Sequence, residues 1–351
     1  MPRVLAALSG GVDSSVAALL LQEAGYEVVG VFMRNGVSGK AGATEKSCCS
    51  ASDSRDAALV ASRLGIPFYA VDFSREFAGL IDHFAAEYRR GRTPNPCVLC
   101  NTHLKFGQLF ELADAVGAEL VATGHYADVR DGRLLRAADA AKDQTYYLFG
   151  VARPVLARVR FPLGRMHKAE VRERARAAGL ATAEKPESME ICFVTSGEYR
   201  DVVRARGGGG ASGVFVDEAG RVLGRHDGVD GFTVGQRSRL PALGTPRYVQ
   251  RIDAVTGTVV LAPREALGSR TATLIGVNWL VDPPGPEGVR CEVKIRARSA
   301  PLPALVVPEA SGGARITFAE PASAAAPGQA AVFYRGDLVL GGGWLEDPTP
   351  A

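Results

Sequence analysis

The chain has 351 residues, of which 46% are hydrophobic and 23% charged, and its 41 basic and 38 acidic side chains give a formal net charge of +3. This is an ordinary globular composition with room for one to three domains, and it excludes a small chain that must be held together by disulfides. The near-balanced charge neither indicates nor excludes a nucleic-acid partner, which needs a basic patch rather than a basic average.

The cellular compartment follows from what the sequence lacks. The first apolar run, residues 4–8, is too short for a signal peptide, and no stretch approaches the ~18 apolar residues of a membrane span. The six cysteines are therefore expected to be reduced, and either buried or chemically active. We predict a cytoplasmic protein.

The first two hundred residues alternate between strand and helix patterns. The apolar runs and the Gly, Ser and Asp residues between them predict strands at 4–8, 27–33, 68–73 and 119–123. Helices are predicted at 14–23, 53–64, 74–90, 104–116 and 168–178. This rhythm predicts an α/β domain with a doubly wound parallel sheet, covered on both faces.

A glycine-rich loop joins the first predicted strand to the first helix. Residues 9–15 read Ser-Gly-Gly-Val-Asp-Ser-Ser, and glycines at such a turn let backbone amides and hydroxyls approach an oxyanion. The lysine of the Walker loop is missing, and so is the spacing of a dinucleotide fingerprint. The string resembles the PP-loop of the ATP pyrophosphatases (adenine nucleotide alpha hydrolase-like proteins), which implies transfer of AMP with release of pyrophosphate. Asp13 would position Mg²⁺ on the phosphates; a turn that binds nothing is the alternative.

Three cysteines stand out from the rest. Cys97 and Cys100 follow a loop stiffened by two prolines, and Cys192 lies far along the chain. Such thiols could carry and release sulfur, or three thiolates could hold an iron–sulfur cluster with an open site. Cys291 is predicted to be a core residue, and Cys48 and Cys49 are predicted to be structural or incidental.

Two further polar groups follow predicted strands or turns. His125 comes directly after a parallel strand, where ligands bind in such sheets, although it could be a simple surface histidine. Residues 142–147, Lys-Asp-Gln-Thr-Tyr-Tyr, combine polar and aromatic groups suited to phosphate contact and base stacking. Any loop that enters a helix could have the same composition.

The pattern changes near residue 205. Four glycines at 207–210 form a natural linker, and beyond them the chain predicts only short strands: 214–216, 248–252, 258–261, 290–296, 304–307, 314–318, 331–334 and 338–340. The alanine-rich stretch 322–326 is predicted to be a loop. We predict three domains: a PP-loop catalytic domain at 1–205, a small central domain at 206–268, and a β-barrel at 269–351.

Taken in order, the motifs resemble one family, the bacterial tRNA-specific 2-thiouridylases. The segments that carry the resemblance are 9–14, 92–101, 105–106, 123–126, 142–147, 162–164, 191–193, 233–237, 327–329 and 341–343. One such motif would be weak, but this ordered set is specific and covers nearly the whole chain. The resemblance implies that ATP adenylates C2 of the wobble uridine of lysine, glutamate and glutamine tRNAs, and that sulfur from a cysteine persulfide replaces the oxygen.

The resemblance also implies roles for individual residues. Cys100 matches the family nucleophile and Cys192 the persulfide-bearing cysteine. The positions matching the ATP contacts are Ala7, Leu8, Ser9, Gly10, Gly11, Val12, Asp13, Ser14, Met33 and Gly124. Those matching contacts to the target base are Asn95, Pro96 and Cys97. Those matching tRNA contacts are His125, Lys142, Asp143, Gln144, Arg296 and Gln329.

One departure from the family pattern concerns the cysteines. Many members carry Asp where this chain has Cys97, which argues against an acid–base role for that side chain. It also strengthens the alternative that Cys97, Cys100 and Cys192 ligate a [4Fe-4S] cluster.

The leading hypothesis is therefore a tRNA 2-thiouridylase that uses ATP and Mg²⁺ and receives sulfur from a cysteine desulfurase or a relay protein. A PP-loop ligase that adenylates a small molecule would explain the loop but not the pair Cys100 and Cys192. Other PP-loop tRNA sulfurases, and a non-catalytic RNA-binding protein with a relic loop, are the remaining alternatives.

Overall fold

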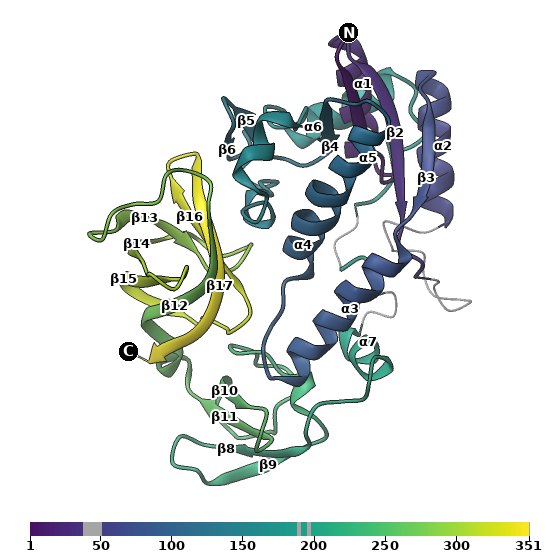
Figure 1. Cartoon of the computed structure of the whole chain (residues 1–351). Coiled ribbons are helices and arrows are strands. Elements are labelled where there is room, and N and C mark those ends of the chain that lie inside the picture. Colours follow the sequence, from purple (N-terminus) through teal and green to yellow (C-terminus); the bar gives the residue numbers. More distant parts are fainter. Residues whose placement is uncertain (38–50, 188–190, 195–197, 351) are drawn as a thin grey trace. The chain divides into compact units, whose positions relative to one another are not determined.

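The computed structural model in Figure 1 describes residues 1–37, 51–187, 191–194 and 198–350, with only the backbone for 51 and 347–350. Cys48 and Cys49 lie outside the described residues. Contacts within the chain define two compact units. The first comprises residues 1–80, 97–197 and 336–339, and the second 81–96, 198–335 and 340–351.

The first unit is built on a five-stranded parallel sheet with the order β3-β2-β1-β4-β7. Its strands are β1 (Arg3–Ala7), β2 (Glu27–Arg34), β3 (Phe68–Asp72), β4 (Leu120–Thr123) and β7 (Val159–Arg160). Its helical segments are α1 (Val12–Glu23), α2 (Ala51–Leu64), α3 (Ser74–Arg89), α4 (Pro96–Leu99), η1 (Cys100–Gln108), α5 (Leu109–Ala115), η2 (Thr145–Tyr147), η3 (Arg153–Arg158) and α6 (Lys168–Ala177), α3 and α4 each running across the unit boundary. A short hairpin, β5 (Asp128–Arg130) and β6 (Arg133–Leu135), follows β4.

Burial explains why this segment forms a parallel sheet. All six inner residues of β2 are buried, as expected for a strand covered on both faces. On one face, alternate residues of β1 pack against α1 and α2 in a single core. That core includes Val4, Ala6, Leu8, Ala18, Leu21, Ala57 and Ala61. The predicted α/β fold class is confirmed.

The strand order fixes where a ligand can bind. The chain runs outward from β1 to β2 and β3, and then returns to place β4 on the other side of β1. The point where the order reverses lies between β1 and β4, and their carboxyl ends meet there, with Ala7 opposite Thr123. Crevices at such switch points are the usual ligand sites of open α/β sheets.

The helix predicted at 104–116 differs from the structure in an informative way. The segment is already helical at Cys100, and residues 100–108 form a π-helix, in which the Leu109 amide donates to the Leu104 carbonyl. The backbone then departs from helical angles at Phe106 (φ −115°, ψ 15°). An apolar repeat alone does not reveal such a wide turn, because the pattern of buried residues shifts only by one position. π-Helical turns are rare in proteins, and those that do occur are often found at functional sites.

The second unit contains two β-structures. A four-stranded sheet has the order β10-β11-β8-β9, where β11 and β8 are parallel and the other pairs antiparallel. Its strands are β8 (Gly213–Val216), β9 (Val222–His226), β10 (Tyr248–Asp253) and β11 (Thr258–Ala262). Beside them in the sequence lie α7 (Tyr199–Ala205), η4 (Val229–Gly231) and η5 (Arg264–Leu267).

The last part of the chain closes into a barrel. The strands follow the order β12-β15-β14-β13-β16-β17, and an additional β12–β17 pairing closes the ring. They are β12 (Gly268–Trp279), β13 (Val289–Lys294), β14 (Leu302–Pro308), β15 (Ala314–Ser323), β16 (Ala330–Arg335) and β17 (Leu338–Pro350). The predicted C-terminal β-barrel is confirmed.

Two details of the β-rich half differ from expectation. The long strand β12 was not predicted, because its sequence mixes polar and apolar residues without clean alternation. The predicted loop at 322–326 is wrong in its first two residues, since β15 continues through Ala322 and Ser323. Within the described part of the chain, no helix has both the length and the apolar character needed to cross a membrane.

Candidate active site

The phosphate loop is stabilised by its own hydroxyl groups. The Ser9 amide donates to Ser14 Oγ at 3.0 Å, and the Ser14 and Ser15 hydroxyls donate to the Gly11 carbonyl at 3.1 and 2.8 Å. Thr182 Oγ1 donates in turn to Ser15 Oγ at 2.9 Å. These hydrogen bonds hold the backbone turn between β1 and α1 in place.

Two glycines are required by close backbone approach. Gly10 has φ +72°, and a Cβ there would lie 2.3 Å from the Asp53 carbonyl oxygen at the start of α2. Gly124 follows β4, and its Cβ would lie 2.7 Å from the Ser14 amide nitrogen. Only glycine lets these backbones come so close, so the predicted ATP contacts 7–14 and Gly124 are brought together. Met33, another predicted contact, is buried at the end of β2.

A lysine from another part of the chain lies at the loop. Lys168 Nζ donates to both carboxylate oxygens of Asp13, at 2.7 and 2.8 Å, and Tyr126 OH donates to Asp13 Oδ1 at 2.9 Å. Lys168 also lies 3.0 Å from Glu187 Oε1, while Lys142 donates to Glu187 Oε2 at 2.7 Å. Burial opposes ionisation of Glu187, but the hydrogen bonds from Lys142 and Lys168 hold its carboxyl pKa below the usual value.

A second ion pair holds the start of α2. Lys185 Nζ donates to Asp53 Oδ1 at 2.6 Å and to Asp56 Oδ2. Segment 182–187 therefore contacts the loop region through Thr182, Lys185 and Glu187. These polar contacts converge on one edge of the sheet.

Asp13 offers a carboxylate suited to magnesium. Mg²⁺ takes one or two carboxylates plus phosphate oxygens and water, so it needs no all-protein cage. Asp13 lies in the first turn of α1, two residues after Gly11, and its side chain is 31% exposed. Asp13 would hold the ion, which would neutralise phosphate charge when bound.

His125 is buried rather than displayed. Its side chain contacts Phe161 edge to face, with centroids 5.9 Å apart, and the residue is 8% exposed. Burial, together with the Lys105 charge, holds the imidazole pKa well below its usual value. Lys105 Nζ lies 3.4 Å from Nε2 and can only donate, so Nδ1 carries the proton and donates to Thr123 Oγ1 at 2.6 Å. The predicted tRNA contact of His125 stays a prediction.

The predicted cysteines lie in different settings. Cys97 is exposed in α4, Cys100 is the first residue of the π-helix, and Cys192 occupies a turn; the last two are half-buried. Asn101, next to Cys100, donates from Nδ2 to the Tyr147 carbonyl at 2.9 Å, which ties the π-helix to the segment at 142–147. Cys291 is half-buried rather than fully in the core as predicted, and burial raises the pKa of its thiol to about 12.

The cysteines do not form a ligand set. Over residues 1–37, 51–187, 191–194 and 198–350, no three His, Cys, Asp or Glu side chains are grouped so that they could hold a metal ion. This arrangement does not fit an iron–sulfur cluster held by Cys97, Cys100 and Cys192.

The segment at 142–147 is ordered by its own side chains. Asp143 accepts hydrogen bonds from the Ala137 amide and from the amide and hydroxyl of Thr145. Gln144 exchanges two hydrogen bonds with Tyr126, each 2.9 Å long. The proposed tRNA-contacting residues Lys142, Asp143 and Gln144 therefore already have protein partners and a fixed backbone.

The remaining predicted residues belong to the second unit. Asn95 and Pro96 are buried, and the loop before them is held by Arg92, which donates to Glu87 Oε2 at 2.8 Å and to Glu346. The Thr93 amide donates to the Pro327 carbonyl at 2.8 Å. These contacts hold the loop that leads to Cys97.

The two tRNA contacts predicted in the barrel also have partners within this unit. Arg296 Nη2 donates to the Val234 and Ala324 carbonyls at 2.8 and 2.9 Å. Gln329 accepts from the Leu345 amide through its backbone carbonyl. Both side chains are half-buried, and their tRNA contacts remain predictions.

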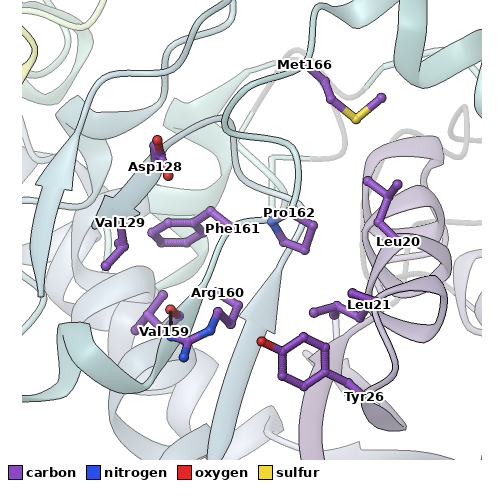
Figure 2. Close-up of a pocket in the computed structure, with 11 residues that line it drawn as sticks. Leu20, Leu21, Tyr26, Asp128, Val129, Val159, Arg160, Phe161, Pro162 and Met166 are labelled. Atoms are coloured by element: carbon purple, nitrogen blue, oxygen red, sulfur yellow. Dashed lines mark hydrogen bonds between the residues drawn. The ribbon is translucent and has the colours of Figure 1, made fainter. Parts of the chain in front are cut away.

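A separate pocket lies beside the edge strand β7. Figure 2 shows Leu20, Leu21 and Tyr26 on one side and Arg160 and Phe161 on the other. None of the predicted site residues lines it. One of its lining residues, Phe161, contacts His125.

The fold and the loop define a class: a nucleotide-binding α/β domain joined to β-rich domains. Three family models match consecutive segments. They are described as tRNA methyl transferase HUP domain (residues 2–196), tRNA methyl transferase PRC-barrel domain (203–263) and aminomethyltransferase beta-barrel domain (269–345).

Relatives of known name match the chain over its full length. The tRNA-specific 2-thiouridylase MnmA of Geotalea uraniireducens is 47% identical, over 98% of this chain and 95% of its own. The MnmA of Chloroflexus aurantiacus is 45% identical over 100% of both. A solved 4-thiouridine synthetase–RNA complex with bound ATP is 17% identical, with a TM-score of 0.38, over 55% of this chain and 45% of its own. The chain belongs to the family of bacterial tRNA-specific 2-thiouridylases.

Sequence reasoning missed Lys168, Lys185 and Glu187. A signal for Lys168 was present: it is the first residue of α6, at the positive end of the helix dipole, where acidic side chains are favoured. A lysine at this position is unfavourable for the helix, which indicates that its side chain has a role outside the helix. The ion pairs themselves could not be predicted, because Lys168 and Asp13 are 155 residues apart.

Proposed function

We propose that this protein is an ATP-dependent tRNA-uridine 2-sulfurtransferase that forms 2-thiouridine at the wobble position. The observation that carries the proposal is the preformed phosphate loop, built without a Walker lysine, in the same compact unit as Cys100 and Cys192. Identity of 45–47% over the full length to the thiouridylases above supports it. A methyl transferase, as the family-model names suggest, would have no need of an AMP-transferring loop.

The first chemical step activates the base. The C2 oxygen of uridine attacks the α-phosphorus of ATP, the bond from that phosphorus to the bridging oxygen breaks, and pyrophosphate leaves with the electron pair. Loop 9–14 and Gly124 hold the nucleotide, Met33 borders it, and Asp13 holds Mg²⁺. The oxygen that leaves poorly as hydroxide now leaves as AMP.

The second step replaces oxygen by sulfur. The terminal sulfur of a Cys192 persulfide attacks C2 and displaces AMP, leaving C2 joined to Cys192 through a disulfide. The Cys100 thiolate attacks the Cys192 sulfur, which forms a Cys100–Cys192 disulfide and releases 2-thiouridine. A dithiol reductant then returns both thiols, and a cysteine desulfurase or relay protein reloads Cys192.

The tRNA partner is the anticodon stem-loop of lysine, glutamate and glutamine tRNAs, and the protein works in the cytoplasm. Asn95, Pro96 and Cys97 surround the extruded base, as base chemistry requires an unstacked nucleotide. His125, Lys142, Asp143, Gln144, Arg296 and Gln329 contact the tRNA.

The test is direct. Purified protein is incubated with ATP, Mg²⁺, unmodified glutamate tRNA, a dithiol and a desulfurase sulfur source, and 2-thiouridine is measured by nucleoside mass spectrometry. Product in aerobic apo-protein supports the persulfide route. Product only after anaerobic cluster reconstitution recasts the cysteines as cluster ligands. No product, while a control thiouridylase modifies the same tRNA, rejects the proposal and favours a small-molecule ligase.

A further inference from the structure

The phosphate loop contains no positively charged side chain to balance the charge of a bound triphosphate. Residues 9–15 supply glycine amides and three hydroxyls but no cation, and the loop lacks the lysine that a Walker loop uses. When pyrophosphate leaves the α-phosphorus, negative charge grows on the departing oxygens. Removing one preorganised group aimed at such developing charge typically costs about 10²–10³-fold in rate.

Lys168 lies where such a cation is needed. Its Nζ is within 2.8 Å of both Asp13 oxygens and 3.0 Å from Glu187 Oε1, and it lies 5.7 Å from the Tyr126 ring centroid. The side chain is only 12% exposed, and its backbone amide is fixed by Asp139 Oδ2 at 3.0 Å. Helix α6 therefore holds this ammonium group at the loop in a defined position.

The ion pair is poorly explained as a device for stability alone. A lysine at the first helical position opposes the α6 dipole, and burying its ammonium group carries a desolvation cost that offsets much of the attraction to Asp13 and Glu187. The arrangement keeps a cation and a metal-binding carboxylate side by side until a ligand separates them.

We infer that Lys168 is a catalytic residue that binds the β- and γ-phosphates of ATP and neutralises the leaving pyrophosphate. Asp13 would hold the Mg²⁺ that accompanies ATP, and the Lys168 ammonium would then be released from Asp13 to contact the phosphate oxygens. Glu187 keeps the ammonium at the site during this exchange. The inference deepens the proposed function and rests on it for the reaction, but Mg·ATP binding tests it separately.

The experiment compares Lys168→Met with Lys168→Arg and with a matched control, Arg174→Met. Arg174 lies on the same helix but pairs with Glu23, so its loss removes a cation from α6 without touching the loop. Each variant is measured for the Kd of Mg·ATP without tRNA and for the kcat and KM of tRNA-dependent pyrophosphate release. Thermal unfolding checks folding, and Lys168→Gln replaces the methionine variant if that one does not fold.

We expect Lys168→Met to raise the Kd of Mg·ATP about 10-fold and to lower kcat about 100-fold. Lys168→Arg should recover much of the binding but only part of kcat, since a guanidinium cannot occupy the ammonium position. Arg174→Met should change neither value more than about two-fold. Wild-type Kd and kcat in Lys168→Met would overturn the inference, as would equal losses in Arg174→Met. Absent pyrophosphate release from the wild type would count against the proposed function instead, while the Kd values would still decide the role of Lys168.

Discussion

The phosphate-loop region and the cysteine-bearing segments of the first unit are built in opposite ways. Around the loop, glycines fix the backbone and three acids have lysine partners: Asp13 with Lys168, Glu187 with Lys142, and Asp53 with Lys185. The cysteines instead lie on an exposed short helix, at the start of a π-helix and in a turn. No described metal-ligand set unites them.

The difference matches the chemistry proposed for each region. Adenylation needs charges aimed at fixed positions before the reaction begins, because reorganising them during the step would cost rate. Sulfur transfer needs thiols that can meet a donor protein, a base and each other in turn, so a rigid shared cage would hinder it. The predictions below test whether the cysteine region truly works through separate thiols and whether the loop region truly depends on its fixed geometry.

The largest effect is expected from the cysteines. Cys100→Ser or Cys192→Ser should lower multiple-turnover formation of 2-thiouridine by ~10³-fold or more, because a hydroxyl neither carries a persulfide nor resolves a disulfide. Nucleoside mass spectrometry measures the product, and tRNA-dependent pyrophosphate release should continue.

Cys97→Ser distinguishes the persulfide mechanism, which uses Cys100 and Cys192, from a site that needs all three cysteines. If the cysteines work as thiols, this variant should lose less than about 10-fold in rate, since an exposed serine is nearly isosteric. A loss as large as that of Cys100→Ser would indicate a three-cysteine site. Cys291→Ala serves as the control, because burial holds that thiol pKa near 12 and keeps it unreactive.

The next effect probes the fixed geometry of the loop. In Gly124→Ala the new methyl group would lie 2.7 Å from the Ser14 amide nitrogen and 2.8 Å from the Asp13 carbonyl carbon, and backbone atoms cannot swing aside. The Kd for Mg·ATP should rise ~10–100-fold, measured by isothermal titration calorimetry.

A glycine on the same unit provides the control. Gly79 lies within helix α3, with nothing within 4 Å of an added Cβ, so Gly79→Ala should leave ATP binding unchanged. It should raise the free energy of unfolding by about 0.5–1 kcal/mol through helix propensity. Equal ATP affinity in both variants would mean that β4 and the loop do not touch in solution as they do here.

These two regions also show which features of the structure could be predicted from the sequence and which could not. The strands and most helices of the sheet could be predicted because their burial is periodic, and the loop because its glycines are adjacent in the chain. Lys168 and Lys185 could not, since their partners lie 155 and 132 residues away and only the fold brings them together. The π-helix at Cys100 was hidden because one extra residue in a turn barely alters the apolar pattern.

The β-rich half shows the same limit. Short strands with clear turns were predicted, whereas β12 was missed because its exposed and buried residues do not alternate cleanly. Its closing pair with β17 depends on register across about seventy residues, which composition does not encode. The predicted domain limits at 205 and 268 stay predictions, and the contacts instead assign residues 81–96 to the same unit as the barrel.

A smaller effect is expected at the loop before the cysteines, within the second unit. Arg92→Met removes the hydrogen bonds to Glu87 and Glu346 and leaves the Glu87 carboxylate, 8% exposed, with Arg90 alone. The free energy of unfolding should fall by about 1–3 kcal/mol, measured by urea denaturation. Arg90→Met is the comparison: its side chain is 70% exposed, so a cost of only ~0–1 kcal/mol is expected. Similar values for the two variants would show that Arg92 does not hold the loop.

The smallest effect concerns the buried His125, whose neutral form the fold requires. Its folded-state pKa lies well below that of the unfolded chain, about 6.5, because of burial and the Lys105 charge. As the pH falls below about 6.5, protons therefore bind preferentially to the unfolded state, and stability is lost until the folded-state pKa is reached. One pH unit below 6.5 corresponds to a loss of about 1 kcal/mol.

The measurement compares the free energies of unfolding of wild type and His125→Gln at pH 8 and pH 5.5. The wild type should lose about 1 kcal/mol more than the variant over this range. Nitrogen-15 NMR of the wild-type imidazole should show the Nδ1–H tautomer, because Lys105 donates to Nε2 and Thr123 accepts from Nδ1. An equal pH dependence in the two proteins, or an Nε2–H tautomer, would mean that His125 is not held in this neutral, buried form.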